Sequence, residues 1–120
     1  MGKSTSVRAI IIHPDATVEV QPRYECSLRN LTGTVGGYLE AIGFNGWHAY
    51  VNEDGIAMRL QQNPLAASVA SLLGWRSFEA TLRGTAIFLG DGPDGEEADV
   101  PEYVATALND LGYPIDWENA

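Results

Sequence analysis

Hydrophobic positions along this chain switch repeatedly between a period of two and a period of three to four, which predicts strands interleaved with helices. Residues 8–13 and 17–20 have strand character and flank a proline-containing turn, so they predict a hairpin. The apolar run at residues 10–12 lacks polar alternation, which indicates a central strand covered on both faces. Residues 28–42 then show helical spacing between Ser27, a typical N-cap, and Gly43, a typical stop.

The second half of the chain continues in the same way. Residues 47–52 and 56–60 alternate on either side of a turn at 52–55, which predicts a second hairpin. Asn63 followed by Pro64 predicts the start of a helix that ends near Gly74, and residues 82–89 have the composition of a buried strand. Asp99 and Glu102 form a pair like a capping box, at the start of a last helix that ends at residue 112.

This order of elements predicts an α+β fold: a single domain with a mostly antiparallel sheet of about five strands and two to three helices packed on one face. The chain has 120 residues, 45% of them hydrophobic, which suits one core and is too short for two domains. We expect a disordered N-terminus at residues 1–6, the domain at 7–112 and an acidic, aromatic tail at 113–120.

The charge of the chain is concentrated at its end. The net charge is −9, and residues 91–120 contain nine acidic residues and no Lys or Arg, so residues 1–90 are electrically balanced. An acidic surface disfavours direct binding to nucleic acid or to an anionic membrane. No apolar run approaches the roughly 18 residues of a spanning helix, and residues 1–6 do not resemble a secretory signal, so we expect a cytoplasmic protein.

Five segments occur together in an order that is more specific than any one of them. They are IIHPD at residues 11–15, VGGYLE at 35–40, YVNEDG at 50–55, NPLA at 63–66 and RGTAIFLG at 83–90. In these segments the chain resembles a family of small proteins of unknown function that are encoded by bacteriophages and by bacteria, many of them actinobacteria. The resemblance implies a phage or mobile-element protein with no established activity, cofactor or catalytic residue.

Few residues suggest chemistry. Gly36 and Gly37 could mark a close approach of a ligand or partner to the backbone, although packing within the fold explains them more simply. His13, His48 and Cys26 are too few and too scattered to predict a nucleophilic or metal site, and the acidic loop after residue 90 lacks the ligand spacing of an EF-hand. The sequence therefore predicts no catalytic residue, metal or cofactor.

Three functions remain open. The first is a non-enzymatic protein that binds and modulates a host or phage protein through its acidic end, with no membrane or direct nucleic-acid partner; a homodimer is compatible with exposed strand edges. The residues predicted to contact that partner are Asp94, Glu96, Glu97, Asp99, Glu102, Asp110 and Trp117. The second is a DNA mimic that inhibits a nucleic-acid enzyme. The third is a small ligand-binding or enzymatic domain, which requires a pocket containing His13, Tyr50 or His48 beside polar groups.

Overall fold

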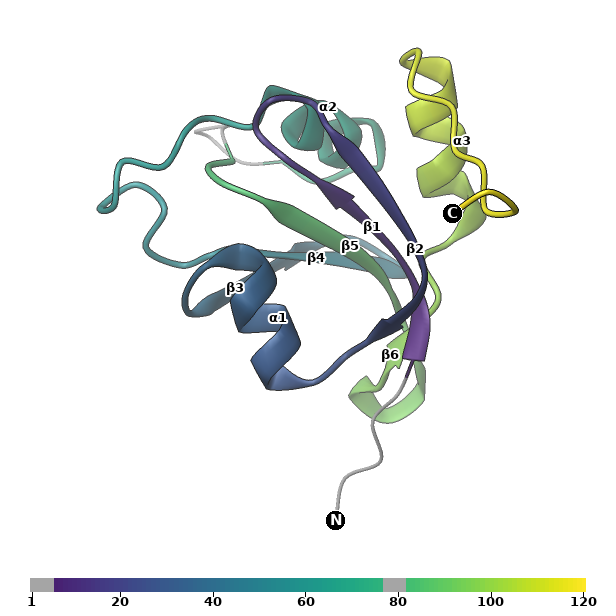
Figure 1. The fold of residues 1–120 in the computed structure, drawn as a ribbon, viewed down its shortest axis with the longest axis horizontal. Helices are drawn as coiled ribbons and strands as arrows, with labels where there is room; N and C mark the ends of the chain where they lie inside the picture. Colours follow the sequence, from purple (N-terminus) through teal and green to yellow (C-terminus); the bar gives the residue numbers. More distant parts are fainter. Residues whose placement is uncertain (1–5, 77–81) are drawn as a thin grey trace.

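The structure, a computed structural model, describes residues 6–76 and 82–120, and in these ranges an antiparallel sheet is combined with three α-helices (Figure 1). In chain order the elements are β1 (Ser6–Ile12), β2 (Val18–Glu25), α1 (Leu28–Val35), β3 (Leu39–Gly43), β4 (Trp47–Asn52), α2 (Pro64–Leu72), β5 (Ala86–Asp91), the short 3-10 turn η1 (Pro93–Gly95), β6 (Glu97–Ala98) and α3 (Glu102–Asp110). The strands lie in the order β2-β1-β5-β4-β3, and β6 pairs with the end of β5. The predicted α+β fold is confirmed.

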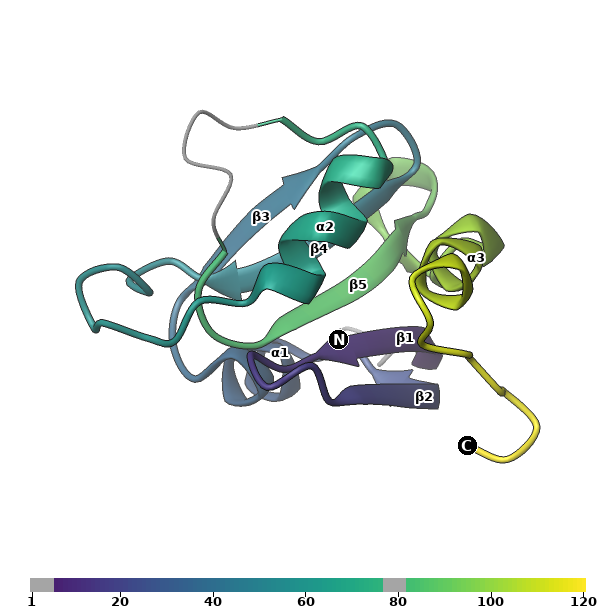
Figure 2. The same ribbon diagram turned by 90° about the horizontal axis from the view of Figure 1, so that it is seen from above.

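Helices cover both faces of the sheet, so the expectation that they pack on one face is wrong. Ile10, Ile12 and Phe88 belong to the core beneath α2 and α3, whereas Ile11 and Ile87 belong to the core beneath α1. Figure 2 shows α2 and α3 on one side of the strands and α1 on the other. Double coverage explains why residues 10–12 and 86–89 are buried without interruption, and it confirms β1 as a central strand.

The largest error of the sequence prediction concerns residues 36–43. The helix predicted over residues 28–42 ends at Val35, because Gly36 takes a left-handed conformation (φ 80°) and donates its N–H to the carbonyl of Thr32. Residues 39–43 instead form β3, the hairpin partner of β4, across a tight turn with positive φ at Asn45 and Gly46. The predicted strand at 56–60 is wrong, since these residues form turns.

The sequence predicted the N-cap of α2 correctly and that of α3 wrongly. Asn63 caps α2 as expected: its Oδ1 accepts the N–H of Ala66 at 3.1 Å, and its buried amide donates to the carbonyls of Ile12 and Gly84, both at 2.9 Å. The capping-box prediction for α3 is wrong. The N-cap residue of that helix is Pro101 and no side chain caps it.

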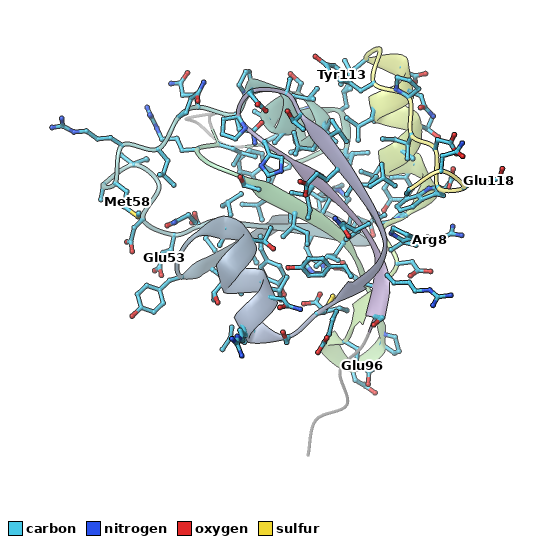
Figure 3. All side chains as sticks on the ribbon, in the orientation of Figure 1. Arg8, Glu53, Met58, Glu96, Tyr113 and Glu118 are labelled. Atoms are coloured by element: carbon cyan, nitrogen blue, oxygen red, sulfur yellow. The ribbon has the colours of Figure 1, made fainter. Side chains whose placement is uncertain are left out.

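The two ends of the chain differ. Residues 1–5, most of the predicted disordered N-terminus, lie outside the described residues, and Ser6 belongs to β1. At the other end, Tyr113, Ile115 and Trp117 pack against the core on the α2–α3 side, and the Arg8 guanidinium lies 5.2 Å from the centre of the Trp117 ring. Figure 3 shows Arg8 beside the final segment that carries Glu118.

In residues 6–76 and 82–120, no helix has both the length and the hydropathy needed to cross a membrane.

Candidate functional site

Two side chains of β4 project onto the face of the sheet that carries α1. Residues alternate along the strand, so that Trp47, Ala49 and Val51 enter the core beneath α2 and α3 while His48 and Tyr50 point to the other side. Trp47, Ala49 and Val51 are buried, whereas His48 and Tyr50 remain partly exposed. The two rings meet edge to face, with centres 5.1 Å apart.

The hairpin of β5 and β6 brings carboxylates to these rings. Asp91 pairs with Glu97 across the hairpin, and the turn between them is closed by a hydrogen bond from the Gly92 N–H to the Glu96 carbonyl at 2.8 Å. A Cβ at residue 92 would lie 2.7 Å from the Glu96 carbonyl oxygen, so only glycine fits there. Asp94 adopts a positive φ of 54° in the same turn. The hairpin is therefore tight, and the backbone that carries its acidic side chains has a defined path.

Hydrogen bonds join the four side chains into one row, Asp91–His48–Glu97–Tyr50, which we call the carboxylate row. His48 Nδ1 lies 2.5 Å from Asp91 Oδ1, and His48 Nε2 lies 2.5 Å from Glu97 Oε1. The Tyr50 hydroxyl donates to the second oxygen of Glu97 at 2.7 Å. Because both neighbours of the imidazole are acceptors, the ring satisfies them together only when both of its nitrogens carry a proton.

Burial also affects the weaker acids near this row. Desolvation, together with the hydrogen bond to Glu97 and its negative charge, raises the pKa of Tyr50 well above its usual value, so the hydroxyl stays a donor. Burial raises the pKa of the Cys26 thiol to about 11, and the charge of Glu97 adds to this effect. Cys26 is therefore a poor nucleophile at neutral pH.

The row indicates a structural connection more strongly than a catalytic one. A general base needs a nitrogen that can accept a proton from a substrate, and both nitrogens of His48 already contact carboxylates. Glu97 is equally occupied, with one oxygen on His48 and the other on Tyr50. The contacts tie β6 and the end of β5 to β4, so they hold the acidic hairpin in place.

A small hollow opens beside the carboxylate row, with a volume of about 240 Å³. Its lining residues are Ala41, His48, Tyr50, Asp91, Gly92, Gly95, Glu96 and Glu97. Three of these carry carboxylates, and none is a lysine or an arginine. Such a surface favours cationic groups over anionic ones, and the Tyr50 ring adds an aromatic wall that suits a guanidinium or ammonium group.

The other residues predicted from sequence to contact a partner do not lie together. Asp94 and Glu96 are exposed on the hairpin, beside the hollow. Asp99 accepts the backbone N–H of Arg8 at 2.8 Å and so has a structural contact. Glu102 and Asp110 are exposed at opposite ends of α3, and Trp117 is half-buried against the core. The structure therefore brings Glu96 and Glu97 together at the hollow, keeps Asp94 near them on the same hairpin, and leaves the others apart.

The glycine pair has a role inside the fold. Gly36 ends α1, and a Cβ at Gly37 would lie 2.8 Å from the amide nitrogen of the Asn52 side chain, which is buried. The backbone at Gly37 thus closely approaches Asn52 of the chain itself. His13, at the far end of β1, contacts Thr85 at 3.0 Å and is not among the residues that line the hollow.

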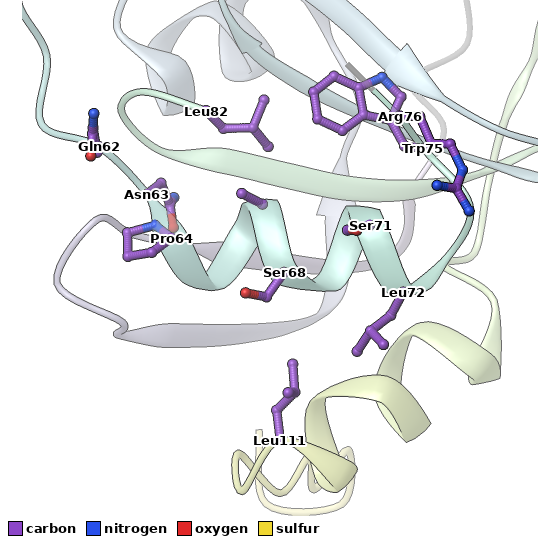
Figure 4. Close-up of a pocket in the computed structure, with 11 residues that line it drawn as sticks. Gln62, Asn63, Pro64, Ser68, Ser71, Leu72, Trp75, Arg76, Leu82 and Leu111 are labelled. Atoms are coloured by element: carbon purple, nitrogen blue, oxygen red, sulfur yellow. The ribbon is translucent and has the colours of Figure 1, made fainter. Parts of the chain in front are cut away.

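A larger hollow of about 710 Å³ lies on the other face of the molecule, along α2 (Figure 4). Figure 4 shows Leu82, Trp75 and Arg76 on one side of the helix and Leu111 on the other. The lining mixes apolar and uncharged polar residues, Arg76 is its one charged residue, and none of the acidic residues contributes to it. Its size is typical of ligand pockets, but its open walls combine aliphatic, aromatic and small polar side chains and do not indicate a particular ligand.

The sequence could not reveal the carboxylate row. His48 and Glu97 are 49 positions apart, and the row depends on the register that places His48 opposite Leu89 and Asp91 opposite Glu97. The available signals were the polar face of β4 and the acidic loop after residue 90, each weak alone. Within residues 6–76 and 82–120, no three His, Cys, Asp or Glu side chains form a group that could hold a metal ion.

Comparison with known proteins gives one match. The model of a family described as a domain of unknown function (DUF3846) matches residues 7–111, which is most of the chain. No curated protein and no solved structure matches the chain.

Proposed function

The chain belongs to the DUF3846 family of unknown function, and from the geometry of its site we propose that it is a non-enzymatic binding module whose acidic hairpin receives a basic segment of another protein. The partner would be a host or phage protein met in the cytoplasm, in keeping with the family resemblance noted in the sequence. Binding would modulate that protein. The observation that carries the proposal is the hollow beside the carboxylate row, where Asp91, Glu96 and Glu97 surround a space of about 240 Å³.

The rigidity of the hairpin supports this proposal. Carboxylates on a mobile loop lose conformational freedom when they bind a cation, whereas here His48 positions Asp91 and Glu97, and the tight turn positions the backbone of Glu96. A lysine or arginine side chain entering the hollow would meet Glu96 without breaking the carboxylate row, because Glu96 lines the hollow outside that row. Complementary charge of this kind raises association rates and selects basic partners.

Peptide binding tests the proposal. A fluorescent peptide with several arginines, and a matched peptide with glutamine in their place, would be titrated with the protein at low salt. We expect the basic peptide to bind and the neutral one not to bind. The double variant Asp94→Asn/Glu96→Gln should weaken binding about 10-fold, since it removes two charges beside the hollow.

The chain offers a matched control for that variant. Glu53 and Asp54 are also adjacent to a turn and exposed, but they lie at the other end of β4. Glu53→Gln/Asp54→Asn changes the net charge equally, so it should alter binding less than about 2-fold. Equal losses in the two double variants would mean that the peptide responds only to net charge, and no binding of the basic peptide at low salt would refute the proposal.

A second candidate function is a site for a small cationic ligand. The hollow contains His48 and Tyr50 beside carboxylates, which is the arrangement that the ligand-binding hypothesis required. Thermal unfolding with spermidine and with free arginine tests it. Stabilisation that disappears in Asp94→Asn/Glu96→Gln would support a small ligand, and stabilisation only by the basic peptide would favour the protein partner.

No separate observation favours the DNA mimic. Asp91 and Glu97 are paired with His48, Asp99 with the backbone of Arg8, and Glu102 and Asp110 lie at opposite ends of α3. The remaining carboxylates after residue 90 are spread over the hairpin, α3 and the final segment, so they do not form one row at the spacing of DNA phosphates. Inhibition of a nucleic-acid enzyme by the protein, lost in Asp94→Asn/Glu96→Gln, would restore this alternative.

A further inference from the structure

The two edges of the sheet differ in how they are protected. β2, at one edge, contains Pro22 and faces a register irregularity between Val7 and Ala9 of β1, and both features discourage pairing with another strand. β3, at the other edge, has no proline, no lysine and a continuous register with β4. Among the described residues, no strand pairs with the outer side of β3.

The hydrogen bonds of the β3–β4 hairpin identify the free backbone groups. The Phe44 N–H donates to the Trp47 carbonyl at 3.2 Å, and the Glu53 N–H donates to the Tyr38 carbonyl at 2.8 Å. In an antiparallel pair, bonded and non-bonded positions alternate, so Glu40 and Ile42 are also bonded to β4. The backbone groups at residues 39, 41 and 43 therefore face outward, away from the sheet.

The side chains around this edge are symmetric about Ala41. Tyr38 precedes β3, Phe44 follows it, and each lies three positions from Ala41. Both are large aromatic side chains; Tyr38 is 73% exposed, and Phe44 is 56% exposed although its ring lies beside Gly74. If a second β3 paired antiparallel with the first around Ala41, Tyr38 of each chain would lie opposite Phe44 of the other.

We propose that the outer edge of β3 is a self-association surface, at which two copies of this chain pair their β3 strands antiparallel about Ala41. The outward backbone groups of Ala41 bond to those of its own counterpart, and those of Leu39 bond to Gly43 of the other chain. Two cross-strand pairs of Tyr38 and Phe44 close the ends of this short ladder. Aromatic cross-strand pairs stabilise antiparallel strands beyond the backbone bonds alone.

The negative charge of the chain opposes this association, so the dimer affinity should depend on salt concentration. Each chain has a net charge of −9, and Glu40 of one chain would lie diagonally across from Glu40 of the other, with about 7–8 Å between them. Salt screens both repulsions. We therefore expect the dimer to become tighter from about 0.05 to 0.5 M NaCl, and Glu40→Gln to tighten it about 2-fold at low salt.

Sedimentation equilibrium measures the association directly. The mass should rise above the 13.0 kDa of one chain as concentration increases. Tyr38→Ser should weaken the dimer about 10-fold, because each dimer loses two aromatic pairs. Leu28→Ser is the matched control, since Leu28 on α1 is equally exposed at 71%, and it should change the dimer less than about 2-fold.

Cysteine crosslinking tests the register. In a Cys26→Ser background, Ala41→Cys would place two cysteines directly opposite each other with Cα atoms about 5.5 Å apart, within the range of a disulfide. Glu40→Cys would place them diagonally, beyond that range. We expect oxidation to crosslink the first variant and not the second.

Clear results would overturn the proposal. The proposal is refuted if the mass stays at 13.0 kDa up to about 1 mM protein at high salt. It is also refuted if the two cysteine variants crosslink equally, or if Tyr38→Ser leaves the dimer unaffected. Ala41→Pro provides a further check, because its outward N–H has no partner within the described chain. This variant should abolish the dimer, and retention of the dimer in the folded variant would also refute the pairing.

Discussion

Replacing His48 by glutamine tests whether the carboxylate row stabilises the fold. The two contacts of His48 differ in environment: the Glu97 side chain is 17% exposed, whereas the Asp91 side chain is 48% exposed. A hydrogen bond to a mostly buried charged group contributes about 1.5–3 kcal/mol, and an exposed ion pair contributes about 0.2–1 kcal/mol. Glutamine can donate to only one of the two carboxylates. We therefore expect His48→Gln to lower the free energy of unfolding by about 2 kcal/mol.

Urea unfolding followed by tryptophan fluorescence measures this loss, since Trp47 beside His48 is buried in the native state. For a chain of this length the change corresponds to a fall in melting temperature of about 8 °C. His13→Gln is the matched control. His13 contacts Thr85 and Glu19 at a more exposed site, so its replacement should cost less than about 1 kcal/mol.

A double-mutant cycle assigns the effect to the pair. The coupling free energy between His48→Gln and Glu97→Gln should be about 1.5 kcal/mol, because the second change removes the charge that the first leaves buried without its partner. If His48→Gln cost no more than His13→Gln, or if the coupling were near zero, the carboxylate row would have no part in holding the hairpin.

Three further expectations concern single residues. At pH 8, iodoacetamide should modify Cys26 about 100-fold more slowly in the folded than in the urea-unfolded chain, because burial raises the thiol pKa from 9.0 to about 11; similar rates would contradict this burial. The pKa of Tyr50 is raised in the folded chain, so its contribution to stability is present below pH 10 and is lost as pH rises further. Tyr50→Phe should reduce this alkaline loss of stability. An unchanged dependence of stability on pH in Tyr50→Phe would refute the expectation. Gly37→Ala should destabilise the fold by about 1–2 kcal/mol in urea unfolding, since its Cβ would contact Asn52, and a neutral effect would exclude that crowding.

Local signals in the sequence predicted the parts of the fold that depend on neighbouring residues. The turn after His13 needs only Pro14 and the strands beside it, and the start of α2 needs only Asn63 and Pro64. The unbroken apolar runs at residues 10–12 and 86–89 likewise indicated strands with two buried faces. In each case a few adjacent side chains determine the conformation.

The segment that follows α1 could not be predicted in this way. Residues 35, 38, 39 and 42 are apolar at helical spacing, yet helix formation competes with pairing to β4, which lies next in the chain. Two local features decide the outcome. Gly36 permits the left-handed turn that ends α1, and Asn45 and Gly46 form the tight turn that returns the chain as β4.

The candidate site could likewise be predicted only in part from the sequence. The excess of acidic residues after residue 90 is visible in composition, but composition does not show which carboxylates are paired. Glu97 and Asp99 belong to the same acidic run, yet one contacts His48 and Tyr50 while the other binds the backbone of β1. Only the antiparallel register of β4, β5 and β6 distinguishes them. Counting charges therefore overstated the acidic surface that is free to bind a partner.

Ala41 belongs to both of the proposed binding surfaces. This residue lines the acidic hollow and also lies at the centre of the β3 edge, so two paired copies would place two hollows on the same face of one continuous sheet, near the symmetry axis. A basic peptide with two binding segments would then engage both hollows, and its apparent affinity should exceed that of a one-segment peptide by at least about 10-fold. Tyr38→Ser, which weakens the dimer, should reduce this advantage without changing the affinity for the one-segment peptide. Loss of binding to both peptides would instead show that the β3 edge itself contacts the peptide, because Tyr38 is not among the residues that line the hollow.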